Sequence, residues 1–86
     1  MRTAICPGSF DPVTFGHLDI FGRASLLFDH VVVAVSRNPI KNPLFSIEDR
    51  VEILKKVLTH YPNIEVDAFD GLTVNYAIKR KAIAIV

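Results

Sequence analysis

Residues 7–17 read Pro7-Gly8-Ser9-Phe10-Asp11-Pro12-Val13-Thr14-Phe15-Gly16-His17. They follow a short apolar run, residues 3–6, and precede an amphipathic one, residues 18–28. This order predicts a strand, a glycine-containing turn and a helix. In α/β folds, phosphates bind where the carboxyl end of a strand faces the N-terminus of a helix. The segment therefore predicts a phosphate site at which the imidazole of His17 hydrogen-bonds a phosphoryl oxygen.

Two glycines of this segment fit that interpretation. Gly8 is expected to allow a tight turn or a positive φ. Gly16 places no side chain beside His17, so that a ligand can approach the backbone closely. Taken singly, a Pro-Gly-Ser turn or a lone histidine after glycine is mostly structural. Their combination at a junction between a strand and a helix is much more specific.

Outward from this segment, apolar runs alternate with amphipathic ones. Strands are predicted at residues 3–6, 31–35, 64–66 and 82–86, and helices at 14–27, from 46 onward and at 72–80. Apolar residues at helical spacing mark the inner faces of the first two helices: Leu18, Phe21, Ala24 and Phe28, then Ile47, Val51, Leu54 and Leu58. The βαβαβαβ order predicts an α/β fold with a parallel sheet and right-handed crossovers.

Composition limits the function classes. The chain has 86 residues, is 50% hydrophobic and carries a formal charge of +1, so it can bury one small core. Balanced charge gives no electrostatic case for binding nucleic acid or an acidic membrane. The one cysteine, Cys6, cannot form an internal disulfide or a cysteine metal cluster, and we expect it to be a small buried hydrophobe. No apolar run approaches the roughly 20 residues that span a bilayer, and we expect a cytoplasmic protein.

Two motifs in the chain resemble those of a known superfamily. Ser9-Phe10-Asp11-Pro12 followed by Thr14-x-Gly16-His17 is similar to the motif of the HxGH-type nucleotidyltransferases, in the variant with threonine in the first place. The continuation through residue 35, and then Asn38-Pro39-x-Lys41-x-Pro43-Leu44-Phe45-Ser46-x-Glu48-Asp49-Arg50, resembles the bacterial phosphopantetheine adenylyltransferases. This resemblance covers essentially the whole chain.

The resemblance implies a Rossmann-like, doubly wound sheet with the active site at its switch point. It implies an enzyme that transfers AMP from ATP to 4′-phosphopantetheine, giving dephospho-coenzyme A and pyrophosphate in coenzyme A biosynthesis. Magnesium would be held mainly through substrate phosphates, and the family is hexameric. In the family, an arginine-containing loop and a serine-rich helix N-terminus follow the matched segment. Residues 1–86 are therefore expected to be the N-terminal portion of a single nucleotidyltransferase domain, inactive alone.

The resemblance also implies roles for individual residues. His17 would be the catalytic residue that contacts the α-phosphate of ATP. Ser9 would touch both the nucleotide and the phosphate of phosphopantetheine, and Phe10 would offer its backbone to ATP. Lys41 would bind the phosphate of phosphopantetheine, and Thr73 would line the site of the pantetheine arm.

Other polar residues receive structural or open assignments. Thr14 is expected to cap the helix rather than to react. Asp11 either orients the loop or is merely a turn residue before proline. His30 and His60 have no context that assigns a role, and the basic run 79–81 is expected to be a solvated helix end.

Three hypotheses of function remain. The first is the phosphopantetheine adenylyltransferase itself. The second is another enzyme of the superfamily, a cytidylyltransferase or a nicotinamide-mononucleotide adenylyltransferase, although these usually carry histidine where Thr14 stands. The third, for the chain by itself, is a non-catalytic fragment that binds phosphate or nucleotide.

Overall fold

The computed structural model describes all 86 residues and has the predicted alternation of strands and helices. The elements are β1 Thr3–Gly8, α1 Phe15–Leu27, β2 His30–Ser36, α2 Ile47–Val57, β3 Ile64–Phe69, α3 Thr73–Lys79 and β4 Ala84–Ile85. β1 is longer than predicted because Pro7 and Gly8 still pair with β2. β4 is shorter than the predicted 82–86, since its pairing with β1 is confined to Ala84 and Ile85.

All four strands are parallel, in the order β3-β2-β1-β4. The chain winds from β1 outward to β3 and then returns to the opposite side of β1. The direction of winding thus reverses between β1 and β4. In open α/β sheets, ligands bind at the carboxyl ends of the strands beside such a reversal.

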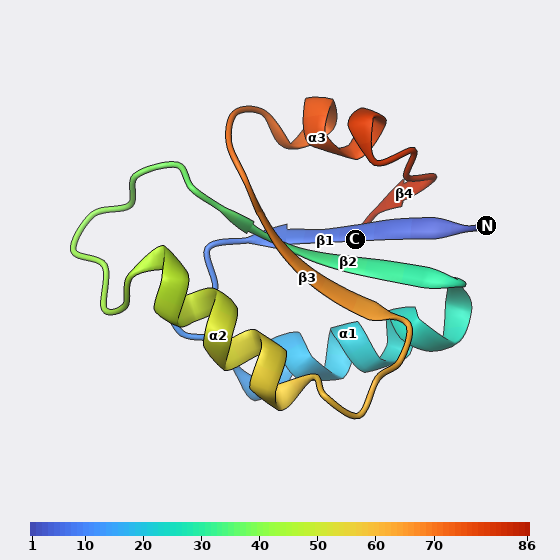
Figure 1. Ribbon diagram of the computed structural model, residues 1–86, viewed down its shortest axis with the longest axis horizontal. Coiled ribbons are helices and arrows are strands. Elements are labelled where there is room, and N and C mark those ends of the chain that lie inside the picture. The colour runs from blue at the N-terminus through green and yellow to red at the C-terminus, as the bar shows by residue number, and fades with distance from the viewer.

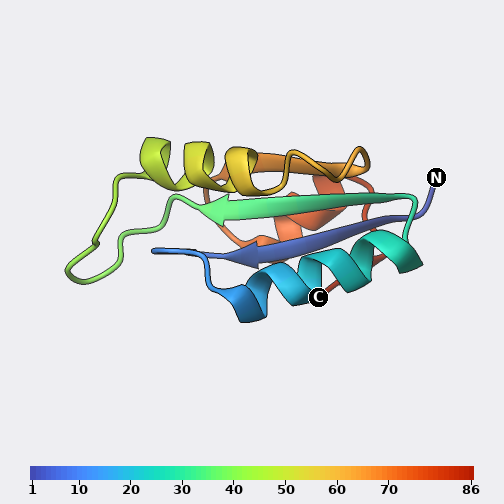
Figure 2. The same cartoon turned by 90° about the horizontal axis from the view of Figure 1, so that it is seen from below.

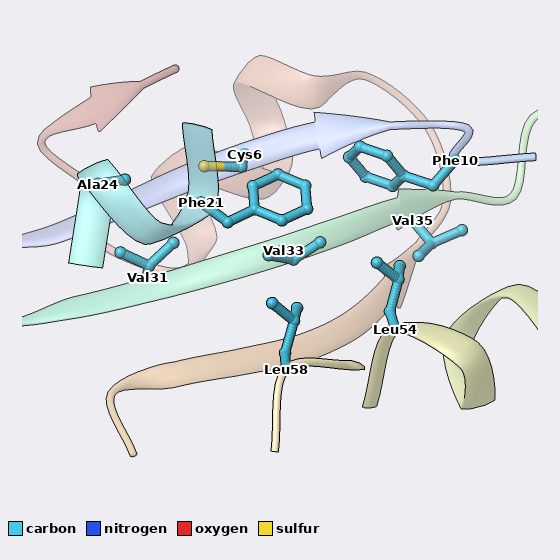
Figure 3. Packing of buried hydrophobic residues seen from close by; sticks show 9 residues of the cluster. All are labelled: Cys6, Phe10, Phe21, Ala24, Val31, Val33, Val35, Leu54 and Leu58. Atoms are coloured by element: carbon cyan, nitrogen blue, oxygen red, sulfur yellow. The ribbon is translucent and has the colours of Figure 1, made fainter. Parts of the chain in front are cut away.

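The helices cover both faces of the sheet, as a doubly wound fold requires. Figure 1 shows α1 and α2 on one side and α3 on the other. The α1/α2 side holds the larger core, which comprises Cys6, Phe10, Phe21, Ala24, Val31, Val33, Val35, Leu54 and Leu58 (Figure 3). The α3 side holds a smaller one, which comprises Ile5, Val32, Ala34, Phe69, Tyr76 and Ala77. β2 contributes alternate residues to both cores, which explains its continuous apolar run.

Two helices begin at residues whose hydroxyls cap them, as the sequence predicts. Thr14 Oγ1 accepts a hydrogen bond from the His17 amide at 3.2 Å, and Ser46 Oγ accepts one from the Asp49 amide at 3.1 Å. Each bond satisfies an amide that has no partner inside its helix. Both caps follow loops at the carboxyl ends of strands, so they fix where these loops end.

The prediction that the basic run 79–81 is simply a solvated helix end is wrong for Arg80. Its guanidinium lies 2.7 Å from Glu65 and 3.2 Å from Asp67, both on β3. His30 Nε2 lies 2.9 Å from the same Glu65 carboxylate. These contacts are between residues far apart in the sequence, which local spacing could not show. No helix has the length and apolar character needed to cross a membrane.

Candidate active site

A cavity of about 170 Å³ lies at the point where the winding reverses. Its lining comes from the end of β1, the following loop, the first turns of α1 and the residue after β4: Cys6, Pro7, Gly8, Ser9, Phe10, His17, Ile20, Phe21 and Val86. Three residues predicted to bind ATP, Ser9, Phe10 and His17, are thus brought together. The cavity is at the position expected for a ligand of a doubly wound sheet.

The loop after β1 depends on Phe10, which has a φ of +48°. Non-glycine residues rarely adopt this region, and the surrounding structure must hold them there. The Phe10 ring is buried and packs edge-on against Phe21, with ring centres 5.4 Å apart (Figure 3). A Cβ at Gly8 would lie 2.8 Å from this ring. Gly8 is therefore needed for space. Of the two alternatives expected at Gly8, a tight turn or a positive φ, the positive φ occurs at Phe10 instead.

His17 is held by the residue that caps its helix. The Thr14 amide donates a hydrogen bond to His17 Nδ1 at 3.1 Å, and Thr14 Oγ1 lies at 3.1 Å from the same nitrogen. A ring nitrogen that accepts from a backbone N–H carries no proton, so the neutral ring carries its hydrogen on Nε2. The Phe10 ring packs edge-on against the imidazole at 5.1 Å. Nε2 is thereby left as a donor on an oriented ring beside the cavity.

Gly16 is not required by the packing of the protein. A Cβ built there would meet nothing closer than Thr14 Oγ1, at 3.6 Å, which is an ordinary contact. The space that Gly16 leaves open is therefore next to His17 and is not filled by the chain itself.

The structure decides the open assignment of Asp11 in favour of orienting a loop. Its carboxylate accepts hydrogen bonds from the amides of Leu44, at 2.6 Å, and Phe45, at 2.8 Å. The buried Arg50 donates to the carbonyl oxygen of Ser9 at 3.0 Å. The local sequence pattern assigns no role to Arg50, because its partner Ser9 lies 41 residues away along the chain.

Lys41 lies on another loop at the same edge of the sheet, and Thr73 follows the loop after β3. Lys41 belongs to the long loop between β2 and α2, which extends beyond the strand ends in both ribbon views (Figures 1 and 2). Lys41 is exposed and forms no ion pair, while Thr73 begins α3 and is half-buried. Asn38 Nδ2, at 3.5 Å from the Gly71 carbonyl oxygen, connects these two loops. Neither Lys41 nor Thr73 lines the cavity that contains His17.

The cavity offers donors rather than a nucleophile. Cys6 is 2% exposed, and burial raises the pKa of its thiol to about 11, so the thiol is neutral near pH 7. No group of three or more His, Cys, Asp or Glu side chains is arranged to hold a metal ion. The arrangement suits the binding of a phosphoryl group through N–H and O–H donors.

Comparison with known proteins agrees with this geometry. The sequence model of the cytidylyltransferase-like family matches residues 5–86. A phosphopantetheine adenylyltransferase of Desulforamulus reducens is 64% identical over all 86 residues, which make up 53% of that protein. Those of Caldanaerobacter subterraneus subsp. tengcongensis and Synechococcus elongatus are 60% identical over 86 residues and 61% identical over 82, covering 54% and 49% of their lengths.

The chain thus spans about half the length of the curated relatives it matches. The family match covers nearly the whole chain, including most of β1, the loop with Ser9, and His17 at the start of α1. The sheet order, the cavity beside β1 and this match lead to one conclusion: the chain belongs to the cytidylyltransferase-like family.

Proposed function

We propose that the protein containing this chain is a phosphopantetheine adenylyltransferase, which transfers AMP from ATP to 4′-phosphopantetheine. The observation that carries the proposal is His17, whose Nε2 donor is oriented beside a cavity at the switch point. The 64% identity to a protein of that name supports this choice of substrates within the family. The family description alone does not select the nucleotide.

The proposed reaction is a direct displacement. A phosphate oxygen of phosphopantetheine attacks the α-phosphorus of ATP, the bond from that phosphorus to the bridging oxygen breaks, and pyrophosphate leaves. No covalent intermediate with the protein is needed, so catalysis consists of positioning and of stabilising charge on the equatorial oxygens. Magnesium would be held mainly through the phosphates of the nucleotide, where it would offset their negative charge.

Each predicted site residue has a part in this scheme. His17 Nε2–H donates to an α-phosphate oxygen, and Ser9 Oγ donates to phosphates of both substrates. The backbone of Phe10 contacts ATP from its positive-φ conformation. Lys41 supplies a positive charge to the phosphate of phosphopantetheine, and Thr73 lies along the pantetheine arm. We also propose a cytoplasmic homo-oligomer, a hexamer as the resemblance implies, with no nucleic-acid or membrane partner.

The proposal is tested by an assay of pyrophosphate release on the complete protein that contains this chain. ATP with 4′-phosphopantetheine is expected to give pyrophosphate and, by mass spectrometry, dephospho-coenzyme A. CTP in place of ATP, and nicotinamide mononucleotide in place of phosphopantetheine, are the controls for the other activities of the superfamily. A preference for either control substrate would replace the proposal with that activity.

A further inference from the structure

Two loops carry the proposed phosphate contacts, and one pair of side chains connects them. The first loop follows β1 and contains Ser9; the second follows β2 and contains Lys41. Asp11 lies in the first loop and binds the second, since its two carboxylate oxygens accept from the amides of Leu44 and Phe45 at 2.6 and 2.8 Å. These amides immediately precede α2, so the carboxylate holds the loop where it enters the helix.

Arg50 makes the reciprocal connection from α2. Its Nη1 donates to the carbonyl oxygen of Ser9 at 3.0 Å, in the first loop. Its Nε lies 3.1 Å from the Phe45 carbonyl oxygen and 3.3 Å from that of Ser46, in the second. The planar guanidinium, with several donors in fixed directions, suits such a set of acceptors.

Asp11 and Arg50 also face each other, with Arg50 Nε 4.0 Å from Asp11 Oδ1. Their side chains are only 9% and 5% exposed, and no buried side-chain polar atom in the structure lacks a partner. A buried ion pair adds little net stability over apolar residues of the same size, because both charges lose their hydration. A role in fixing geometry therefore accounts better for this pair than a role in stability.

We propose that Asp11 and Arg50, the Asp11–Arg50 clamp, are positioning residues that hold the two loops together as one phosphate site. This proposal rests on the proposed function for the identity of the substrates. The clamp fixes the position of Ser9 relative to Lys41, so that both side chains reach the phosphate of phosphopantetheine. Neither clamp residue lines the cavity that contains His17.

The two halves of the clamp have different expected kinetic effects. Asp11→Asn keeps one oxygen acceptor but turns an NH2 group toward the second amide, which releases the loop of Lys41. It should raise KM for phosphopantetheine by about tenfold or more, the usual effect of losing one hydrogen bond to a charged group, and leave KM for ATP within about threefold. Arg50→Lys loses the donor to Ser9, whose proposed contacts include both substrates. It should therefore raise both KM values.

The double variant tests whether the two residues act as one device. Residues in one hydrogen-bonded network show non-additive effects. The combined change in KM for phosphopantetheine should be well below the product of the two single changes. Asp19→Asn and Arg23→Lys, in an exposed ion pair of 3.0 Å on α1, are the matched controls and should leave both KM values unchanged.

Hydrogen exchange supplies a readout that does not depend on the identity of the substrates. The Leu44 and Phe45 amides are expected to be protected in the complete wild-type protein and to exchange at least about tenfold faster in Asp11→Asn. If the wild type makes no dephospho-coenzyme A, the proposed function fails, and exchange alone then decides whether the clamp orders the loop. Asp11→Asn is nearly isosteric with the wild type. If Arg50→Lys does not fold, Asp11→Asn alone tests whether the clamp positions the two loops.

The proposal is overturned by either of two results. One is unchanged protection of both amides in Asp11→Asn. The other is a lowered melting temperature with KM values like those of the wild type, which would make the clamp a structural ion pair only.

Discussion

At His17, the two ring nitrogens have different environments. Nδ1 accepts from the Thr14 amide at 3.1 Å, while Nε2 remains beside the cavity. The capping box at the start of α1 therefore selects the tautomer as well as starting the helix. The residue that caps the helix, Thr14, thus also orients the proposed catalytic donor through a second hydrogen bond.

The first prediction concerns the cap itself. Thr14→Ala removes the hydroxyl that accepts from the His17 amide, and should lower the free energy of unfolding by about 0.5–2 kcal/mol. Thr14→Ser keeps the hydroxyl and should stay close to the wild type. Urea denaturation measures both, and equal stability of the two variants would show that the cap does not stabilise α1.

The second prediction concerns Lys41. Lys41→Ala should weaken phosphopantetheine binding by about 1.5–3 kcal/mol, the usual contribution of a hydrogen bond to a charged group, and should affect ATP much less. Calorimetric titration of the complete protein with each substrate measures this. Lys56→Ala, an exposed lysine 3.4 Å from Glu52 on α2, is the control and should change neither affinity. Equal losses for both substrates would contradict the role given to Lys41.

The residues of the cavity are easier to recognise from the sequence than those that support the cavity. Ser9, Phe10 and His17 are close in sequence and could be recognised together. The positive φ of Phe10, the steric requirement at Gly8 and the bonds of Arg50 all depend on where other side chains pack. Packing between residues far apart in the chain cannot be predicted from local sequence. The role of Asp11 therefore stayed open, and Arg50 received no role.

At the level of the elements, β3 is an edge strand of the sheet. The sequence predicted only residues 64–66 as a strand, although apolar and charged residues continue to alternate through Ala68. In the structure it continues to Phe69, because it pairs with β2 as far as Ser36. The Tyr76 hydroxyl donates to Asp67 at 2.6 Å, and Arg80 binds Asp67 and Glu65. Burial, followed by the bond to Asp67, raises the pKa of Tyr76 to about 12. The charged residues of this edge strand, Glu65 and Asp67, thus bind side chains of α3 and of the residue that follows it.

The third prediction is a change in acid stability. The hydrogen bond from Arg80 holds the pKa of Glu65 below its ordinary value of 4.5. The pair therefore stabilises the fold fully above pH 4.5, and this contribution is lost as the pH falls through the lowered pKa of the folded state. Arg80→Met should lower stability at pH 7 by about 1 kcal/mol, as expected for a partly exposed network.

The difference in stability between the wild type and Arg80→Met should become smaller as the pH falls below 4.5. Thermal unfolding at a series of pH values measures it. Arg23→Met, which removes an exposed pair on α1, serves as the control and should show little change. A difference that stays constant with pH would mean that Arg80 acts through packing on Tyr76, whose ring lies 5.8 Å away.

For the whole molecule, the order of elements was predictable from alternating patterns, and the resemblance supplied the doubly wound topology. The placement of α3 and β4 leaves an exposed apolar surface that includes Val74, Ile78, Ile83 and Ile85. Contiguous exposed apolar surface of this kind commonly marks an interface. The relatives have about as much chain again as the matched segment.

The fourth prediction is that the 86-residue chain alone transfers AMP at least about a hundredfold more slowly than the complete protein. The triphosphate of ATP carries several charges, and the cavity offers only donors from one loop and one helix N-terminus. A chain that carries only half of the active site cannot position both substrates as a complete, preorganised site does. The isolated chain should also self-associate in light scattering through its apolar surface. Turnover within tenfold of the complete protein would show that the second half of the fold is dispensable.

The most direct test of the account follows the α-phosphorus of ATP through a single turnover. With ATP labelled at that position, the complete protein should place the label in dephospho-coenzyme A and leave none on the acid-quenched protein, because transfer needs no nucleophilic side chain. His17→Ala should lower the rate by about 10²-fold or more, as loss of one donor to developing charge does, and should keep the fold. Label retained on the protein, or a His17→Ala rate near that of the wild type, would contradict the account.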